Sequence, residues 1–166
     1  LYNNVYKDIA DYQTLPTGTY GAKILWQDTP ELLQAVFSGD GRDGSIFIQT
    51  TNASGNAVVA FTIDGVVYWS WHIWVTDYNP ETTFTSYNSR RFMDRHLGTR
   101  GNNSAGTVTN AYEAHGLLYQ WGRKDPFIWS TGLTSSSRKP VYGETGNVPL
   151  TGNDDFIGSL GGDAAK

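Results

Sequence analysis

The sequence predicts an α+β domain that consists mainly of antiparallel β-strands and contains one helix. Aromatic residues make up 14% of the 166 residues, which favours strands, because large rings pack well on a pleated sheet. Nineteen glycines supply the tight turns that join short strands. The third observation is a pattern near the middle of the chain that predicts a β-hairpin.

Two apolar runs, residues 56–63 and 66–75, form this hairpin, with Asp64-Gly65 between them. A two-residue Asp-Gly link is typical of a type I′ turn, because both central residues must take positive φ. The turn predicts these cross-strand pairs: Ile63 with Val66, Phe61 with Tyr68, Val59 with Ser70, Ala57 with His72, Val58 with Trp71 and Ala60 with Trp69.

The predicted register places Trp69 and Trp71 on one face of the hairpin, together with Ile73 and Val75. This face is apolar along its whole length, and such a face has to be shielded from water. We therefore expect both indoles to be buried in the core.

Shorter apolar runs predict the other strands, at residues 24–26, 32–37, 45–50 and 92–97. A helical turn is the alternative for residues 32–37. The polar residues 76–88 are expected to form a loop.

The one helix is expected at residues 111–121, where apolar side chains recur at helical spacing. Asn110 is a suitable residue to cap its start, and Gly122 is suited to end it. The whole chain then divides into an irregular N-terminal arm (residues 1–19), a β-rich module (20–129) and a polar, extended C-terminal segment (130–166), in which large apolar residues are sparse.

Composition and charge exclude several classes of protein. The chain has no cysteine, so disulfides, thiolate metal sites and a cysteine nucleophile are excluded. Its net charge is −4 and its basic residues are scattered, which argues against nucleic acid as a partner. No apolar run approaches the roughly 20 residues that a membrane-spanning helix needs.

Four strings of residues carry a resemblance to a known family. They are Gly-Asn-Ala-Val-Val-Ala at 55–60, Trp-Ser-Trp-His-Ile-Trp-Val-Thr-Asp-Tyr at 69–78, Met-Asp-Arg-His-Leu-Gly at 93–98, and Gly-Leu-Leu-Tyr-Gln-Trp-Gly-Arg-Lys-Asp-Pro-Phe at 116–127. Together they resemble the C-terminal module of fimbrillin-type surface proteins of gut bacteria, which is similar to the FISUMP family. The resemblance spans about residues 20–129 and implies a C-type-lectin-like fold.

The resemblance stops after Phe127. Family members usually continue into a Pro-x-Gly-(Trp/Tyr)-Arg-(Val/Leu)-Pro segment, and the sequence here does not. We therefore expect either a truncated lectin-like module or one in which residues 130–166 replace the missing half.

The function that the resemblance implies is non-enzymatic: a secreted binding or adhesion module of a bacterial surface protein or fimbrium. Its partner would be a glycan or a protein at the cell surface, including other fimbrial subunits. One alternative is a structural subunit or fragment that is held in a larger surface assembly by strand exchange. A weaker alternative is a carbohydrate-active enzyme, but no pair of carboxylates has a spacing that favours it.

Aromatic residues outside the predicted core are the candidate ligand-binding residues. Tyr68 and Trp74 lie on the hairpin face opposite Trp69 and Trp71 in the predicted register, and Tyr78 and Trp129 are further candidates. Exposed rings bind sugars by stacking on their apolar C–H faces. Packing in the core or in an interface is the alternative interpretation.

The chemistry-bearing residues predict structure rather than catalysis. Asp94 and His96 share one side of a predicted strand, but no serine stands in a nucleophile motif, so we assign no catalytic residue. A cofactor is not expected; Asp40 and Asp43, in a glycine-rich turn, are weak candidates for binding calcium. Structural roles are expected for the following residues: Trp69, Trp71, Asp94, Arg95, Trp121 and Arg123. Arg123 or Lys124 is the expected partner of Asp94 or Asp77.

Overall fold

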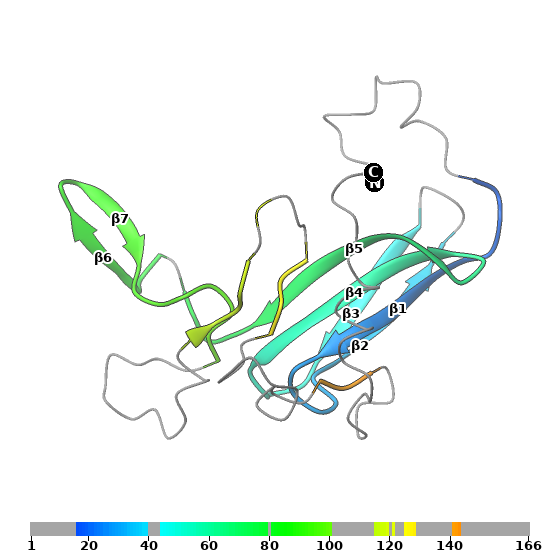
Figure 1. Cartoon of the computed structure of the whole chain (residues 1–166), viewed down its shortest axis with the longest axis horizontal. Coiled ribbons are helices and arrows are strands. Elements are labelled where there is room, and N and C mark those ends of the chain that lie inside the picture. Colours follow the sequence, from blue (N-terminus) through cyan, green and yellow to red (C-terminus); the bar gives the residue numbers. More distant parts are fainter. Residues whose placement is uncertain are drawn as a thin grey trace.

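The computed structural model describes residues 16–39, 44–79, 81–100, 115–119, 121, 125–128 and 141–143 (Figure 1). In these residues the fold consists mainly of antiparallel β-strands, as predicted. The strands are β1 (Tyr20–Gln27), β2 (Leu33–Ser38), β3 (Ser45–Thr50), β4 (Gly55–Ile63), β5 (Val66–Val75), β6 (Phe84–Tyr87) and β7 (Arg90–Met93). They form one three-stranded sheet and two separate hairpins.

The three-stranded sheet has the order β1-β4-β5 and holds the core of the molecule. Its central strand, β4, is buried at every residue. This burial follows from position, since β4 has a neighbour along each edge and a layer of side chains against each face.

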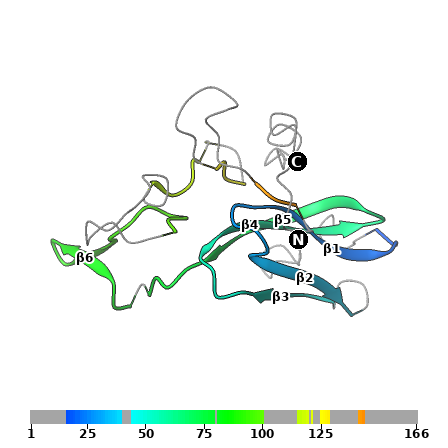
Figure 2. The ribbon, with the colours of Figure 1, turned by 90° about the horizontal axis from the view of Figure 1, so that it is seen from below.

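The β2–β3 hairpin covers one face of this sheet. Leu33 of β2 and Leu32, just before it, pack against Ala57 and Val59 of β4 and against Ile24 of β1. Figure 2 shows β2 and β3 as a second layer beside the sheet. Burial alternates along β2, where Leu33, Ala35 and Phe37 are shielded and Val36 is exposed, because only one side of this hairpin meets the sheet.

Segments from the second half of the chain cover the other face. Leu117, Ile128 and Val141 pack on Val58 of β4 and Trp26 of β1. Figure 2 shows these segments on the side of the sheet away from β2 and β3. Backbone hydrogen bonds of 2.9 Å in both directions join Tyr142 to Gln27, so Tyr142 lies beside the last residue of β1 in an isolated antiparallel bridge. Burial of both faces explains why the sheet strands are apolar.

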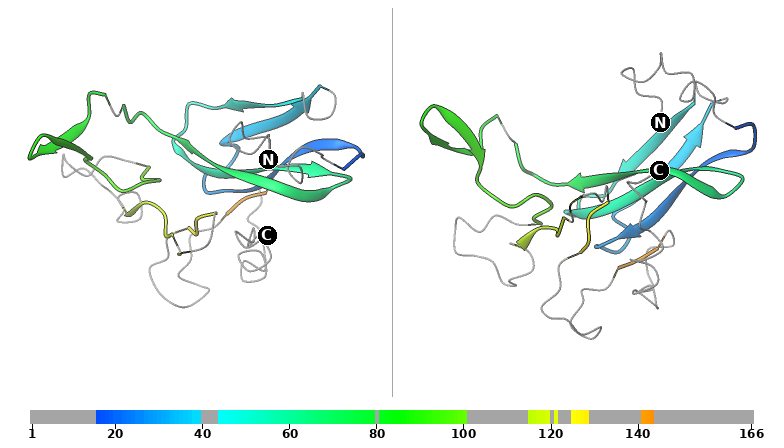
Figure 3. Two further views of the ribbon diagram at one scale, coloured as in Figure 1. Left: turned by 90° about the horizontal axis from the view of Figure 1, so that it is seen from above. Right: turned by 45° about the horizontal axis from the view of Figure 1, so that its top comes forward.

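The β6–β7 hairpin projects away from the sheet, as Figures 1 and 3 show. Its turn residues, Asn88 and Ser89, have φ of 49° and 63°, which places both in the left-handed region that a tight hairpin turn requires. The prediction of a loop at residues 76–88 is therefore wrong for β6. The strand predicted at 92–97 instead begins at Arg90 and ends at Met93.

The predicted β4–β5 hairpin is confirmed, but its register is wrong beyond the turn. Val67 pairs with Thr62 and Trp69 pairs with Phe61, so Tyr68 is an extra residue in a β-bulge. Because side chains alternate between faces, one extra residue moves every later side chain of β5 to the opposite face. Trp71 consequently lies opposite Val59, and not opposite Val58.

The expected burial of both indoles is wrong for Trp71, which is 41% exposed, and Trp69 is only half-buried. The physical reason is their position on an edge strand. Among the described strands none lies beyond β5, so the layer that shields β4 does not cover the outer side of β5.

The predicted helix is contradicted where the structure describes it. Leu118 is joined to Phe127 by backbone hydrogen bonds of 2.9 and 2.8 Å in an antiparallel bridge. A residue in such a bridge is extended, so no helix runs through Leu118. Residues 111–114 lie outside the described residues.

Candidate functional site

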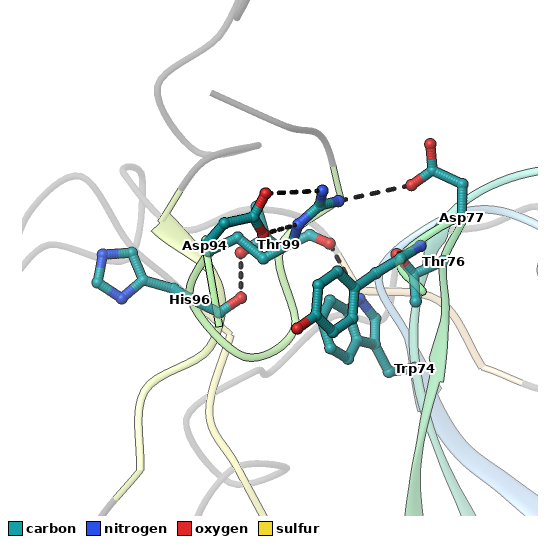
Figure 4. Close-up of polar contacts among 8 residues, drawn as sticks. Trp74, Thr76, Asp77, Asp94, His96 and Thr99 are labelled. Atoms are coloured by element: carbon teal, nitrogen blue, oxygen red, sulfur yellow. Dashed lines mark hydrogen bonds and ion pairs between the residues drawn. The ribbon is translucent and has the colours of Figure 1, made fainter. Parts of the chain in front are cut away.

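The last residues of β5 and the chain that returns from β7 form a cluster at the base of the projecting hairpin (Figure 4). The Trp74 indole N–H donates a 2.9 Å hydrogen bond to the carbonyl of Thr99. The Trp74 ring stacks on the ring of Tyr78, with 5.7 Å between centroids and 21° between planes. The end of β5 is thereby joined to Tyr78, which precedes the β6–β7 hairpin in sequence, and to Thr99, which follows it.

The charged side chain of Arg95 belongs to the same cluster. Its Nε donates to Asp94 Oδ1 at 2.8 Å, and one terminal nitrogen lies 3.6 Å from Asp77 Oδ1. The guanidinium also lies over the Tyr78 ring, 4.8 Å from its centroid. The Arg95 side chain is only 6% exposed, so these partners replace the water that the charge has lost.

The hydrogen bond from Arg95 holds the pKa of Asp94 below its usual range. Asp94 thus remains a carboxylate at neutral pH, and Arg95 remains a cation. We call Trp74, Asp77, Tyr78, Asp94, Arg95 and Thr99 the base cluster. The polar groups of the base cluster are hydrogen-bonded or ion-paired to one another. These contacts join the segment that leads into the β6–β7 hairpin to the segment that leads out of it.

A second polar group lies inside the sheet, centred on Asn56 of β4. The Asn56 backbone N–H donates to Asp28 Oδ1 at 2.7 Å. Its side-chain nitrogen donates to Asp28 Oδ2 at 2.9 Å and to the Gly98 carbonyl at 2.8 Å. Because both amide hydrogens have acceptors, the Asn56 oxygen is left to accept from His72 Nε2, 3.0 Å away. This network defines the Nε2–H tautomer of His72.

Burial lowers the pKa of His72 below 6.5, against the opposing effect of Asp28 and Asp125. The imidazole is therefore neutral at neutral pH.

Through Asn56, the network joins the turn after β1, the centre of the sheet and the loop at Gly98. Gly98 has φ +82°, and a Cβ there would lie 2.6 Å from Leu117 Cγ, so glycine is required at this position. We call Asp28, Asn56, His72 and Gly98 the polar junction.

The structure brings only some of the predicted ligand-binding residues together. Trp74 and Tyr78 are in contact, but their rings stack on each other. Tyr68 sits at the bulge, six residues before Trp74, which corresponds to roughly 20 Å along an extended strand. Trp129 lies outside the described residues, as do the calcium candidates Asp40 and Asp43.

The residues predicted to be structural divide in a similar way. Asp94 and Arg95, which are adjacent in sequence, form a charge-assisted hydrogen bond with each other, and Arg95 also forms an ion pair with Asp77 of the segment before β6. The partner described for Asp94 and Asp77 is Arg95, and Arg123 lies outside the described residues. Trp121 is fully exposed, which contradicts a packing role for it in the described part of the chain.

Two features of the site were not found from the sequence. The β6–β7 hairpin has a signal, since Asn88-Ser89 stands between two short runs that mix aromatic and polar residues. The polar junction has none, because Asp28 and Asn56 are 28 positions apart and only the fold brings them together. Local patterns predict neighbours in a hairpin but not contacts between distant segments.

Within the described ranges, no three histidine, aspartate or glutamate side chains are grouped so as to hold a metal ion. In the same ranges, no helix has the length and apolar character needed to span a membrane. Comparison of the chain with models of known protein families, with curated proteins and with solved structures found no match.

Proposed function

We propose that this chain is a non-enzymatic, extracellular binding module of a bacterial surface or fimbrial protein, with the β6–β7 hairpin as its binding element. The observation that carries the proposal is the contrast between this hairpin and its base. Tyr87 and Phe92 are 70% and 51% exposed on a hairpin that projects from the sheet (Figure 3). Exposed aromatic side chains grouped on a projecting element are typical of recognition surfaces.

The base cluster supports this proposal because it fixes the orientation of the hairpin. Arg95 holds Asp77, before β6, and Asp94, after β7, so both ends of the excursion are tied to one guanidinium. A binding element that is already ordered loses less conformational entropy when it binds. The extracellular setting and the adhesive role rest on the sequence resemblance to fimbrillin-type and FISUMP modules; the C-type-lectin-like fold remains part of that proposal.

A hairpin-deletion variant tests the proposal. Residues 84–93 are replaced by a short glycine-serine link, and both proteins are applied to a glycan array and to whole bacterial and host-cell surfaces. We expect the variant to stay folded, as judged by its urea unfolding midpoint, and to lose the binding of the parent protein. Equal binding by both proteins would contradict the assignment of the hairpin. Hydrolysis of the array glycans by the parent would contradict the non-enzymatic role.

The structure also favours a second candidate function, a subunit held in a surface assembly by strand exchange. Strand β5 is ten residues long, contains no charged residue and no proline, and has no partner on its outer edge among the described strands. Val66 and Val67 are exposed on it. Charged residues and prolines are what usually protect such an edge from pairing with another chain.

Substitution of Val67 by lysine distinguishes this candidate from the first. If β5 accepts a strand from another copy or another subunit, the parent protein forms oligomers or captures that subunit, and Val67→Lys abolishes this association. If the parent is monomeric at high concentration and captures no subunit, strand exchange at β5 is contradicted. Sedimentation velocity measures both outcomes.

A further inference from the structure

We propose that one face of the β6–β7 hairpin binds an acidic sugar, a pyranose that carries a carboxylate. Arg90 would hold the carboxylate, and the rings of Tyr87 and Phe92 would pack against the sugar. The inference rests on the proposed function, since it names the class of ligand for the same hairpin.

The strand pairing defines which side chains share this face. Tyr87 pairs with Arg90, and Thr85 pairs with Phe92. Side chains of paired residues point to the same side, and so do side chains two positions apart along a strand. Thr85, Tyr87, Arg90 and Phe92 therefore form one surface, which we call the ligand face.

The two neighbouring arginines of β7 differ in their partners. Arg91, on the other side of the hairpin, lies 4.5 Å over the ring of Phe84 and 3.6 Å from a carboxylate oxygen of Glu81. Arg90 is exposed, and within the described residues it has no ion pair and no ring contact. The charge of Arg91 is thus paired with the carboxylate of Glu81 on the surface, while Arg90 has no such partner among the described residues.

The chemistry of the ligand face fits an acidic sugar. A guanidinium binds a carboxylate through two parallel N–H···O bonds, and the ligand face holds no carboxylate of its own to compete. Aromatic rings offer their negative faces to the C–H groups on the apolar side of a pyranose. Thr85 adds a hydroxyl that can donate to a sugar oxygen or accept from one.

The size of the ligand face favours a small ligand over a protein. Each strand has four residues, which corresponds to roughly 13 Å of extended chain. A stable protein interface covers about 800 Å² on each partner, which is more than a surface of this length and two strands in width provides. One or two sugar rings match the face, and a carboxylate on one of them matches its single positive charge.

The test uses digalacturonic acid as the acidic probe and galactobiose as the neutral one, each titrated into the ¹⁵N-labelled whole chain and followed by NMR chemical shifts. We expect digalacturonic acid to shift the amides of β6 and β7 and galactobiose to bind at least about tenfold more weakly. Arg90→Ala should weaken binding of digalacturonic acid by a similar factor. Arg91→Ala is the matched control and should change it less than about twofold, since Arg91 is on the opposite face.

Three results would overturn the inference: no shift at β6 and β7 with digalacturonic acid, equal binding of both sugars, or equal losses in Arg90→Ala and Arg91→Ala. Binding of a poly-glutamate peptide in place of digalacturonic acid would also overturn it and assign the face to an acidic protein partner. The proposed function is tested separately by the hairpin deletion. If the deletion abolishes surface binding while digalacturonic acid causes no chemical shift change in β6 and β7, the hairpin is still the binding element, and the assignment of an acidic sugar as its ligand is wrong.

Discussion

The β4–β5 and β6–β7 hairpins have similar turns and opposite surroundings. Asp64 and Gly65 join β4 to β5 with φ of 51° and 79°, and Asn88 and Ser89 join β6 to β7 with φ of 49° and 63°. Every residue of β4 is buried, whereas in the β6–β7 hairpin only Phe84 is partly shielded. The same local geometry thus produces a core element in one place and a displayed element in the other.

This difference shows that the turn residues determine where a hairpin forms, whereas the elements packed against the hairpin determine whether it is buried or exposed. The β4–β5 hairpin has β1 along one edge and side-chain layers on both faces. In the part of the chain that the structure describes, the cluster around Arg95 holds the β6–β7 hairpin at its base. Stability should therefore depend on the first hairpin, and recognition on the second.

The largest expected effect comes from a matched pair of phenylalanines. Phe61 in β4 is 8% exposed and packs against the rings of Tyr20 and Phe37, while Phe92 in β7 lies on the exposed face. Phe61→Ala should lower the free energy of unfolding by about 3–5 kcal/mol, because it removes a buried ring and leaves a cavity. Phe92→Ala should change it by less than about 0.5 kcal/mol. Urea unfolding followed by tryptophan fluorescence measures both changes. Similar losses of stability in the two variants would contradict the view that stability depends on the β4–β5 hairpin and not on the β6–β7 hairpin.

Removal of the Arg95 charge should have the next largest effect, and a local one. Arg95→Met leaves Asp94 and Asp77 without their shared cation, so the chain between β5 and β7 should open more often. We expect cleavage within residues 76–95 to become faster by a factor on the order of ten in limited proteolysis, while the sheet stays protected. Arg91→Met, which removes an exposed ion pair, is the control. Equal cleavage of both variants would mean that the base cluster does not hold the hairpin.

A pH titration separates the hairpins, because His72 lies in the first and no group that titrates near pH 6 lies in the second. The folded state lowers the pKa of His72 through burial, so the unfolded chain takes up a proton at higher pH than the native protein does. The free energy of unfolding should therefore fall as the pH drops below about 6.5. His72→Gln, which keeps an N–H donor towards Asn56, should remove this dependence. If the pH dependence of the free energy of unfolding is unchanged in His72→Gln, its assignment to His72 is wrong. A further loss of stability at still lower pH is expected from Asp94, whose pKa is also lowered.

The smallest expected effect comes from exchanging turn residues. Gly65→Ala forces a residue with a Cβ into φ +79° and should cost about 1 kcal/mol of global stability. Ser89→Gly relieves the same strain in the projecting hairpin, but that hairpin opens without unfolding the sheet. Its effect on the urea midpoint should be within error, while amide exchange in β6 and β7 slows. A global stabilisation by Ser89→Gly would show that the two hairpins unfold together.

Much of the fold could be predicted because its signals are local. The Asp64-Gly65 link and the apolar runs around it specify the β4–β5 hairpin, and alternation specifies β3 at Ser45–Thr50. The bulge could not be predicted, because Val67, Tyr68 and Trp69 are all apolar and the alternation does not mark the extra residue. Strand β6 was missed because it is short and half polar.

The candidate site was predictable only in part for a related reason. Trp74 and Tyr78 are close in sequence, and their contact follows from a short loop. The contact of Arg95 with Asp77 joins residues 18 positions apart across the β6–β7 hairpin, and the contact of Asn56 with Asp28 joins residues 28 positions apart through the packing of the sheet. Trp71 was assigned to the core because the predicted register lacked the bulge, and an error of one residue exchanges the two faces of a strand.

The bulge at Tyr68 has a consequence for how this strand tolerates insertions and deletions. A chain that lacked Tyr68 could pair Val67 with Thr62 and Trp69 with Phe61 in a regular ladder, so the later side chains of β5 would keep their present faces. Loss of this one codon would then remove the bulge and leave both faces of β5 unchanged, whereas loss of a residue from the regular ladder after it would exchange the faces of the residues that follow. Tyr68 is therefore the position in β5 where the strand can lose a residue without changing which side chains face each layer.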